Sequence, residues 1–225
     1  MKRSLLALAV LSSLSITVVA ADYKAGDIII RGGATMVSPD SDKSAIYLGG
    51  NDSSMSLTVD ENTQIGLNLV YFYDKNWAVE ILAATPFTHD VTIQDQNGVL
   101  GVDGARLAEV SQLPPTISAL YYFDTTTKFK PYVGAGINYT IFFDEEFESA
   151  PESLGLTDLE LDGSFGLSFQ VGADYQIDDK WHVNASARYI SIESEATFNV
   201  GGDNIGKANV DVDPMVYSIM LGYKF

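Results

Sequence analysis

The chain has no cysteine and only two histidines, His89 and His182. The absence of cysteine excludes disulfide scaffolds, thiolate chemistry and cysteine-ligated metal sites. The sequence also lacks a phosphate-binding loop, a metal-binding motif and a nucleophile elbow. Neither histidine has an evident serine or aspartate partner, so we expect both to be structural or solvated. We therefore predict that the protein is not an enzyme and that it uses no cofactor and no metal.

Long apolar runs are missing except at the amino terminus. There, Lys2 and Arg3 precede an apolar run over residues 5–11, and small residues follow at 18–21. This order of basic, apolar and small residues is typical of a secretory signal. A transmembrane anchor is the weaker interpretation, because a spanning helix needs roughly 20 apolar residues. We predict that residues 1–21 are a signal peptide, cleaved after Ala20 or Ala21, and that residues 22–225 form a single domain.

Basic residues are scarce as well. The 13 lysines and arginines face 30 acidic residues, which gives a formal net charge of −17. Without Lys2 and Arg3, 11 basic residues face 30 acidic ones, and the net charge becomes −19. Nucleic-acid binding needs basic patches that displace counterions, so this charge balance argues against a nucleic-acid partner.

The carboxyl-terminal segment 215–225 alternates strictly. Large apolar or aromatic residues stand at every odd position, and Ser218, Gly222 and Lys224 are among the even positions. Successive side chains of a strand point to opposite faces, so this strand has one apolar face and one mixed face. A soluble sandwich buries such a face, whereas an outer-membrane barrel turns it toward lipid.

Seven earlier segments alternate in the same way. Together with 215–225 they predict eight strands, over residues 27–37, 63–73, 77–84, 116–123, 132–143, 163–175 and 181–198. The connections alternate between long (38–62, 85–115, 144–162, 199–213) and short (74–76, 124–131, 177–180). A soluble lipocalin-like barrel also has eight strands, but nothing requires it to place every long loop at one end.

This pattern predicts an all-β fold. It is an eight-stranded antiparallel up-and-down transmembrane β-barrel with long extracellular loops and short periplasmic turns. The expected location is the outer membrane of a Gram-negative bacterium, with outer-membrane lipid and lipopolysaccharide as surroundings. We expect the strand that ends at Phe225 to be recognised by the barrel assembly machinery.

Two features of the expected outer end are irregular. In the seventh strand, Ile190 and Ile192 fall on the polar face, which predicts a bulge or a strand end that rises above the membrane. Residues 152–159 are expected to form a helical turn. The loop 144–162 is strongly acidic, and two interpretations stay open, a solvated face or divalent-cation binding beside lipopolysaccharide phosphates. Its carboxylates lack the spacing of a calcium loop.

Four blocks of sequence resemble a known family. They are residues 130–140 (Lys-Pro-Tyr-Val-Gly-Ala-Gly-Ile-Asn-Tyr-Thr), 82–87, 113–116 and 222–225. In order and spacing they closely resemble the OmpW family of small outer-membrane proteins. The resemblance implies an eight-stranded barrel with a narrow, largely hydrophobic lumen. It also implies a role in moving or binding small apolar molecules.

The alternation assigns two kinds of inward-facing residues to this lumen. The charged set is Arg31, Glu80, Asp174, Arg188 and Lys224, and the apolar set is Val70, Phe72, Leu82, Leu120, Tyr122, Phe142 and Met220. By height we expect Arg31 to pair with Glu80, and Lys224 with Asp174, and such pairs would plug the barrel floor. The apolar residues above that floor form either ordinary packing or a hydrophobic conduit. Leu82 and Arg188 are the candidates for a constriction.

The resulting hypothesis is passive binding or passage of small hydrophobic solutes. Pro86, Pro114 and Pro115 cannot donate ladder hydrogen bonds, so the third and fourth strands are expected to separate near their outer ends and to release solute sideways into lipid. The alternative is a structural or receptor barrel that presents acidic loops to phage, bacteriocins or other partners.

Overall fold

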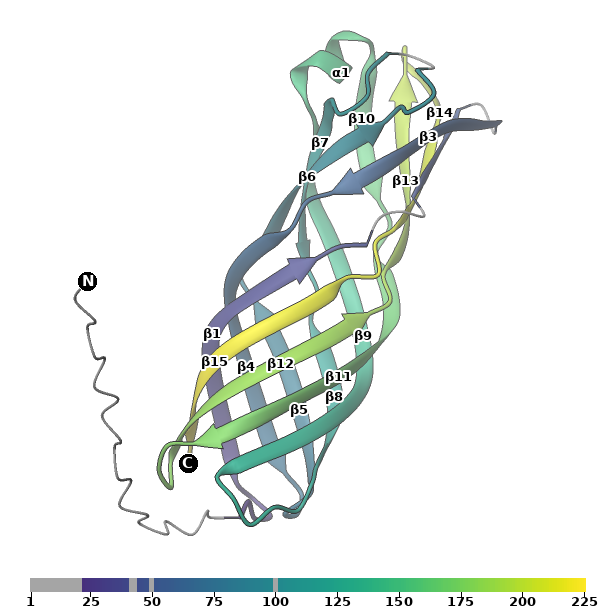
Figure 1. The fold of residues 1–225 in the computed structure, drawn as a ribbon. Helices are drawn as coiled ribbons and strands as arrows, with labels where there is room; N and C mark the ends of the chain where they lie inside the picture. Colours follow the sequence, from purple (N-terminus) through teal and green to yellow (C-terminus); the bar gives the residue numbers. More distant parts are fainter. Residues whose placement is uncertain (1–21, 41–43, 49–50, 99–100) are drawn as a thin grey trace, which may run out of the picture.

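The computed structural model describes residues 22–40, 44–48, 51–98 and 101–225. The predicted signal peptide, residues 1–21, lies outside the described residues. Within them the chain forms two stacked parts, each built from strands (Figure 1). We call these parts the closed barrel and the extension. No helix in the described residues is long and apolar enough to cross a bilayer.

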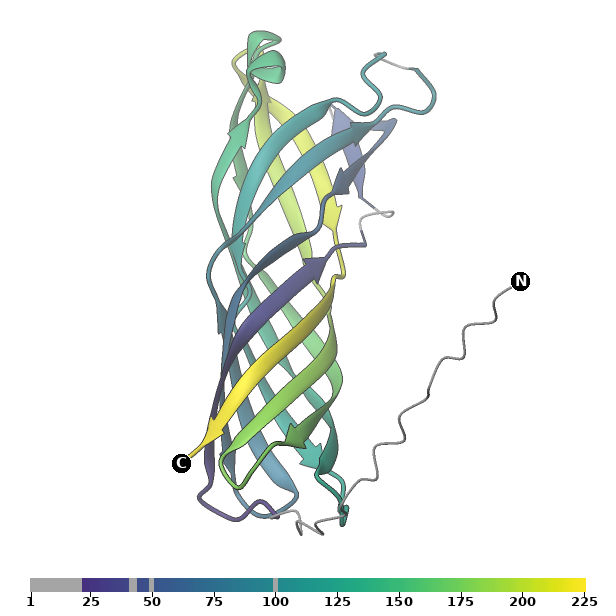
Figure 2. The same ribbon diagram turned by 60° about the vertical axis from the view of Figure 1, so that its left-hand side comes forward.

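The closed barrel contains eight antiparallel strands, as the sequence predicted. In ladder order they are β1 (Ile28–Ser38), β4 (Asn62–Phe72), β5 (Trp77–Ala84), β8 (Thr116–Tyr122), β9 (Phe129–Phe147), β11 (Ser164–Gln176), β12 (Trp181–Ile190) and β15 (Met215–Lys224). Pairing of β15 with β1, from Lys224 opposite Ile29 to Met215 opposite Ser38, closes the ring. Short turns join the strands at one end, which we call the turn end (Figure 2).

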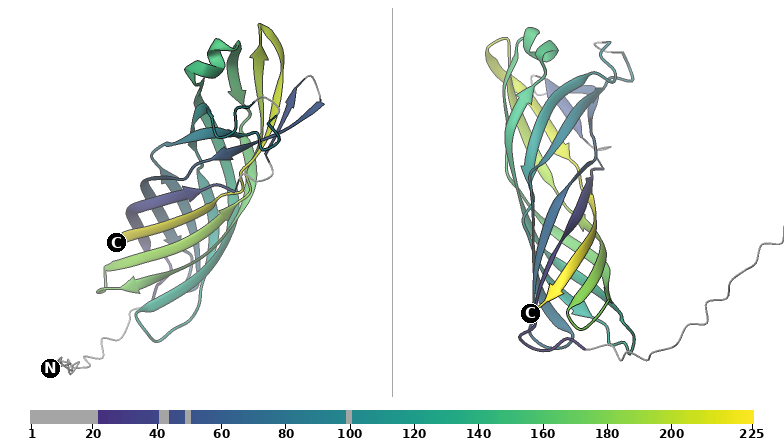
Figure 3. Two further views of the ribbon diagram at one scale, coloured as in Figure 1. Left: turned by 45° about the horizontal axis from the view of Figure 1, so that its top comes forward. Right: turned by 90° about the vertical axis from the view of Figure 1, so that its left-hand side faces the viewer.

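The predicted long connections are present and, instead of irregular loops, most of their residues form further strands. These are β2 (Ala45–Leu48), β3 (Asn51–Val59), β6 (Phe87–Gln94), β7 (Arg106–Leu113), β10 (Leu156–Leu161), β13 (Glu193–Val200) and β14 (Asp203–Asp211). With the upper part of β9 they make the extension, in the order β10-β13-β14-β2-β3-β6-β7-β9. The strands of the extension thus follow one another around the molecule in the same order as the closed-barrel strands that they continue (Figure 3).

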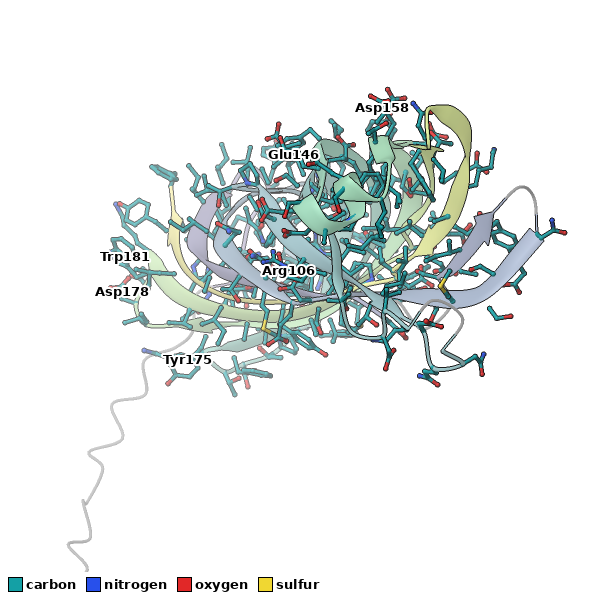
Figure 4. All side chains as sticks on the ribbon, turned by 90° about the horizontal axis from the view of Figure 1, so that it is seen from above. Arg106, Glu146, Asp158, Tyr175, Asp178 and Trp181 are labelled. Carbon is teal, nitrogen blue, oxygen red and sulfur yellow. The ribbon has the colours of Figure 1, made fainter. Side chains whose placement is uncertain are left out.

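A single short helix, α1 (Ser149–Ser153), caps the described part of the extension. It lies at the top of the molecule in Figure 1. The helical turn expected over 152–159 is therefore misplaced, because Leu156 already begins β10. In the view from above, Glu146 and Asp158 lie toward the outer margin of the extension (Figure 4).

The outer surface of the closed barrel is apolar. Ile65, Phe165 and Ile219 are each about two-thirds exposed, although each stands in a regular strand. Aromatic side chains gather near the turn end, where Trp77 packs edge-on against Tyr121, and Trp181 against Tyr223. An apolar band flanked by aromatic residues is the outer face of a membrane-spanning barrel.

Two glycines of the closed barrel stand where a side chain would collide with the backbone of a neighbouring strand. A Cβ atom at Gly136 on β9 would lie 2.2 Å from the carbonyl oxygen of Ile117 on β8. A Cβ at Gly33 on β1 would lie 2.2 Å from the carbonyl oxygen of Ile219. The Gly-Ala-Gly sequence of β9 therefore allows a close approach of neighbouring strands.

The irregular seventh strand marks the boundary between the two parts. β12 ends at Ile190, β13 begins at Glu193, and Ile190 and Ile192 are both buried. They belong to the apolar core of the extension. The predicted break in the alternation is thus confirmed. It occurs because the interior changes from polar in the closed barrel to apolar in the extension at the boundary between β12 and β13.

Candidate functional site

Glu80 organises one half of the charged interior of the closed barrel. It projects inward from β5 and is 1% exposed. Its Oε2 accepts hydrogen bonds from Arg31 Nη1 at 3.3 Å and from Asn68 Nδ2 at 2.9 Å. Its Oε1 accepts from Gln170 Nε2 at 2.9 Å and from Arg188. A buried carboxylate is tolerated only when it is paired and hydrogen-bonded, and Glu80 satisfies both conditions through β1, β4, β11 and β12.

Asp174 on β11 organises the other half. Arg31 Nη2 and the Tyr23 hydroxyl each donate to Asp174 Oδ2 at 2.8 Å, and the Tyr122 hydroxyl donates at 3.2 Å. Asn184 Nδ2 donates to Oδ1 at 2.8 Å. Arg31 therefore bridges both buried carboxylates. We call Arg31, Glu80, Asp174 and Arg188 the ionic network.

The fifth predicted lumen charge, Lys224, stands apart from this network. Its Nζ lies 3.7 Å from Asp27 Oδ2 at the turn end. Arg31 contacts Glu80 as predicted, but the predicted pair of Lys224 with Asp174 is wrong, because Asp174 is held by Arg31. Strands of a barrel are tilted and staggered, so counting from strand ends does not fix which side chains meet across the lumen.

An aromatic cluster closes the turn end and contacts the ionic network at Asp174. It consists of Tyr23, Phe72, Tyr122 and Tyr132, and we call it the aromatic floor. Tyr23 stacks on Phe72 with ring centroids 4.3 Å apart, and Tyr122 lies 4.8 Å from Tyr132. All four rings are buried, with Ile29, Val70, Ala78 and Leu120 packed among them.

The apolar residues assigned to the lumen are therefore distributed differently from our expectation. Val70, Phe72, Leu120 and Tyr122 belong to the cluster at the floor. Placing Phe72 and Leu120 above a charged floor was wrong. Both pair with Ala78, which lies two residues nearer the turn end than Glu80. Glu80 therefore lies above Phe72 and Leu120, whereas Asp174 is hydrogen-bonded directly to the floor hydroxyls of Tyr23 and Tyr122.

The other three members of the apolar set lie higher. Leu82 is buried two residues above Glu80 on β5, and its ladder partners are Asn68 and Thr116. Met220 is buried on β15. Phe142 lies in the extension part of β9.

The extension encloses an apolar cavity of about 290 Å³. Its wall is contributed by strands around the whole extension and includes Met55, Leu57, Val91, Ile93, Phe142, Phe147, Leu156, Phe198 and Val210. An apolar cavity of roughly half this volume is enough to hold benzene in another protein. The cavity is therefore large enough for one small apolar molecule.

Both histidines have defined partners. His89 falls in the predicted long connection 85–115, but it is not solvated, because it is buried in β6 and lines the cavity. Its Nδ1 lies 2.7 Å from the carbonyl oxygen of Asp60, and its Nε2 lies 3.0 Å from Gln112 Nε2. His182, near the turn end, has its Nε2 3.8 Å from Asp174 Oδ1. Gln112 was not singled out in the sequence, although it stands at a buried position of a half-apolar strand.

The wall is interrupted at the level of the prolines. β5 pairs with β8 up to Leu82 opposite Thr116, and β6 pairs with β7 from Phe87 opposite Gln112. Residues 83–86 and 113–115 lie between these two ladders and include three prolines. On its other side, the β7–β8 junction stays bonded to β9, where Tyr139 N donates to Pro115 O at 3.2 Å. The interruption agrees with the predicted weak point of the wall.

Comparison with known proteins identifies relatives over the whole chain. The sequence pattern of the OmpW family matches residues 24–225. Outer membrane protein W of Vibrio cholerae is 42% identical over 226 residues, covering 100% of both chains. The crystal structure of the outer membrane protein OprG from Pseudomonas aeruginosa superposes with a TM-score of 0.83. It is 40% identical and covers 91% of this chain and 98% of that chain.

A more distant relative is named dibenzothiophene metabolism operon protein PahQ, from Pseudomonas aeruginosa. It is 26% identical over 196 residues, covering 87% of each chain. The close relatives are outer-membrane proteins of Gram-negative bacteria, and this chain shares their closed barrel and its apolar outer face. The protein described here is thus an outer-membrane barrel, and it belongs to the OmpW family.

Proposed function

We propose that this protein binds small hydrophobic molecules in the cavity of its extension and passes them, without an energy source, toward the lipid of the outer membrane. The observation that carries the proposal is the apolar cavity of about 290 Å³. Concave, mostly apolar sites of a few hundred Å³ are typical of small-molecule binding. Burial of a solute's apolar surface supplies the binding free energy, at roughly 25 cal/mol for each Å² removed from water.

Straight passage through the closed barrel is disfavoured by its contents. A solute that moves down from the cavity would have to pass both the ionic network and the aromatic floor. Displacing Arg31 or Arg188 from Glu80 would leave charges buried without a partner, which is costly. A sideways path through the interrupted wall at Pro86, Pro114 and Pro115 avoids that cost.

Two further features support the proposal, one for the kind of solute and one for its path. A relative carries a name that places it in a dibenzothiophene metabolism operon, and dibenzothiophene is a fused aromatic compound. The lower wall of the cavity also reaches the level of the interruption, because Gln112 and Phe142 line it. The cavity and the interrupted wall are therefore adjacent.

A receptor role is the second candidate. The outer surface of the extension exposes carboxylates, among them Glu146 and Asp158 (Figure 4). Such a surface is suited to contact with phage, bacteriocins or other partners. If only changes on this surface have a phenotype, and changes in the cavity have none, the receptor role is the better explanation.

The direct test is uptake of labelled naphthalene by intact cells with and without the protein. Leu57 lines the cavity, whereas its neighbour Thr58 is exposed. We expect Leu57→Asp to abolish the gain in uptake, because binding of an apolar solute would remove water from the new carboxylate, which is energetically costly. Thr58→Asp is the matched control and should retain the gain. Equal uptake by cells that carry the wild type, either variant or no barrel would overturn the proposal.

The sideways path has a separate test. The chain has no cysteine, so an Ala83→Cys, Pro115→Cys pair can be oxidised without competing thiols. We expect oxidation to reduce uptake reversibly by bridging the interrupted wall. The matched control is Ile81→Cys with Ile117→Cys, two residues that already face each other in the ladder. Undiminished uptake in the oxidised Ala83→Cys, Pro115→Cys protein would exclude this path.

A further inference from the structure

One polar pair interrupts the apolar wall of the cavity. His89 comes from β6 and Gln112 from β7, and both side chains line the cavity. Their exposed fractions are 3% and 4%. A polar side chain in an apolar site fixes the orientation of a ligand, so this pair is the place to look for selectivity.

The hydrogen bonds of His89 determine how Gln112 is oriented. His89 Nδ1 lies 2.7 Å from the carbonyl oxygen of Asp60, which only accepts, so Nδ1 carries the proton. Burial lowers the pKa of His89 below its ordinary value, which favours the neutral ring near pH 7. In the neutral ring Nε2 is then an acceptor, and it receives its hydrogen bond from Gln112 Nε2 at 3.0 Å.

This arrangement fixes the carbonyl oxygen of Gln112 on the opposite side of the amide. Oε1 is buried and has no hydrogen-bond partner in the described structure. The ladder partners of Gln112 are Phe87 and Phe142, which flank it with apolar rings. A donor that reaches this oxygen would form a stabilising hydrogen bond, because the oxygen is otherwise buried among apolar neighbours without a partner.

We propose that Gln112 Oε1 is the acceptor for ligands that combine an apolar body with one hydroxyl or N–H group. The apolar body fills the cavity, and the donor reaches Oε1 when the half-buried ring of Phe142, which also lines the cavity, moves aside. This inference rests on the proposed function, because it assigns a ligand class to the same cavity. It separates phenols and alcohols from ethers and hydrocarbons of equal size.

The test compares two probes with the same ring system. In 2-naphthol the oxygen donates, whereas in 2-methoxynaphthalene it only accepts. Binding is measured on the full-length mature chain in phosphatidylcholine nanodiscs, with partition into empty nanodiscs subtracted. We expect the wild type to favour 2-naphthol, and Gln112→Leu to lower that preference about 2- to 10-fold, the effect of losing one hydrogen bond.

Two further variants sharpen the test. Gln94→Leu makes the same substitution on the outward face of β6, away from the cavity, and should keep the preference. His89→Leu removes the partner that orients the amide, so Gln112 can present either its N–H or its oxygen. We expect the preference to fall in this variant while Gln112 is intact.

The outcomes separate the two proposals. If both probes bind and the preference is the same in wild type and Gln112→Leu, the role of Gln112 is overturned while the cavity keeps its function. If neither probe binds the wild type above empty nanodiscs, the proposed function fails together with this inference. A preference that falls in Gln112→Leu and His89→Leu, but not in Gln94→Leu, supports both.

Discussion

In β4 of the closed barrel, Ile65 and Leu69 face outward and Asn68 faces inward, whereas in β6 of the extension Val91 faces inward and Thr92 outward. Both strands alternate with the same period of two, but the apolar phase is reversed. The closed barrel buries a network of polar and charged side chains above and beside its aromatic floor, and the extension buries a mainly apolar core. The two parts share one strand order and differ in what surrounds them.

The reversal follows from the two solvents. Lipid accepts apolar side chains on the outside of a barrel at no cost, so the interior of the closed barrel is free to hold a satisfied ionic network. Water does not, so the extension gains stability only by turning its apolar side chains inward. The place where the phase reverses is therefore the place where the chain leaves the hydrocarbon, near the junctions at Pro86, Pro115 and Ser191.

The largest expected effect comes from breaking the ionic network. Glu80→Leu leaves Arg31 and Arg188 buried without their shared partner, and removal of one member of a buried pair costs about 3–5 kcal/mol. The matched change in the extension is Glu195→Leu, which removes an exposed pair with Lys207 (N–O distance 2.5 Å). That change should cost no more than about 1 kcal/mol. Urea unfolding of both variants in lipid vesicles measures the difference, and similar losses would contradict the contrast between the parts.

A second test places a charge on the outer face of each part. Ile219 is 68% exposed near the middle of β15. Ile219→Lys should destabilise by about 2–4 kcal/mol, as a lysine near the bilayer midplane does. Thr58 also faces outward, on β3, and Thr58→Lys should change the free energy of unfolding by less than about 0.5 kcal/mol. A small effect at Ile219 would mean that this face of the closed barrel does not lie in hydrocarbon.

The closed barrel and the extension also differ in how far the sequence predicts them. The eight strands of the closed barrel were predictable, because each carries an uninterrupted outward apolar face, as in 215–225. The extension was missed although Val91 and Ile93 alternate with Thr92 and Gln94 just as regularly. The residues around these strands are polar and acidic, which is typical of loops. An alternation whose apolar phase reverses at a proline is the signal that would have found them.

The interior of the closed barrel was less predictable than its strands. Which residues face inward follows from period two, and Arg31, Glu80, Asp174 and Arg188 all do. Which of them meet depends on strand stagger, a property of the assembled barrel. The orientation of Gln112 depends in turn on a carbonyl group 52 residues earlier, at Asp60, through His89. Contacts of this kind have no local sequence pattern.

The smallest expected effect concerns the water-facing rim of the closed barrel. Asp178, four residues after the buried Asp174, lies in the turn before β12, close to Trp181, the first residue of that strand (Figure 4). Its Oδ1 accepts hydrogen bonds from the backbone N–H groups of Trp181 and Lys180, both at 2.8 Å. These hydrogen bonds lower the pKa of Asp178 in the folded protein.

A carboxyl group whose pKa is lowered by folding stabilises the protein above its unfolded pKa, about 3.9 for aspartate. That stabilisation is lost as the pH falls through the lowered pKa of the folded state. Asp178→Ala should therefore unfold more readily than the wild type at pH 7, and the two stabilities should converge below about pH 4. Urea unfolding of both proteins from pH 7 down to pH 2 measures this convergence. A difference in stability that stays constant with pH would mean that Asp178 acts through the geometry of the turn and not through its charge. The stability contributed by the rim would then be independent of ionisation, as it is for the apolar outer face of the barrel.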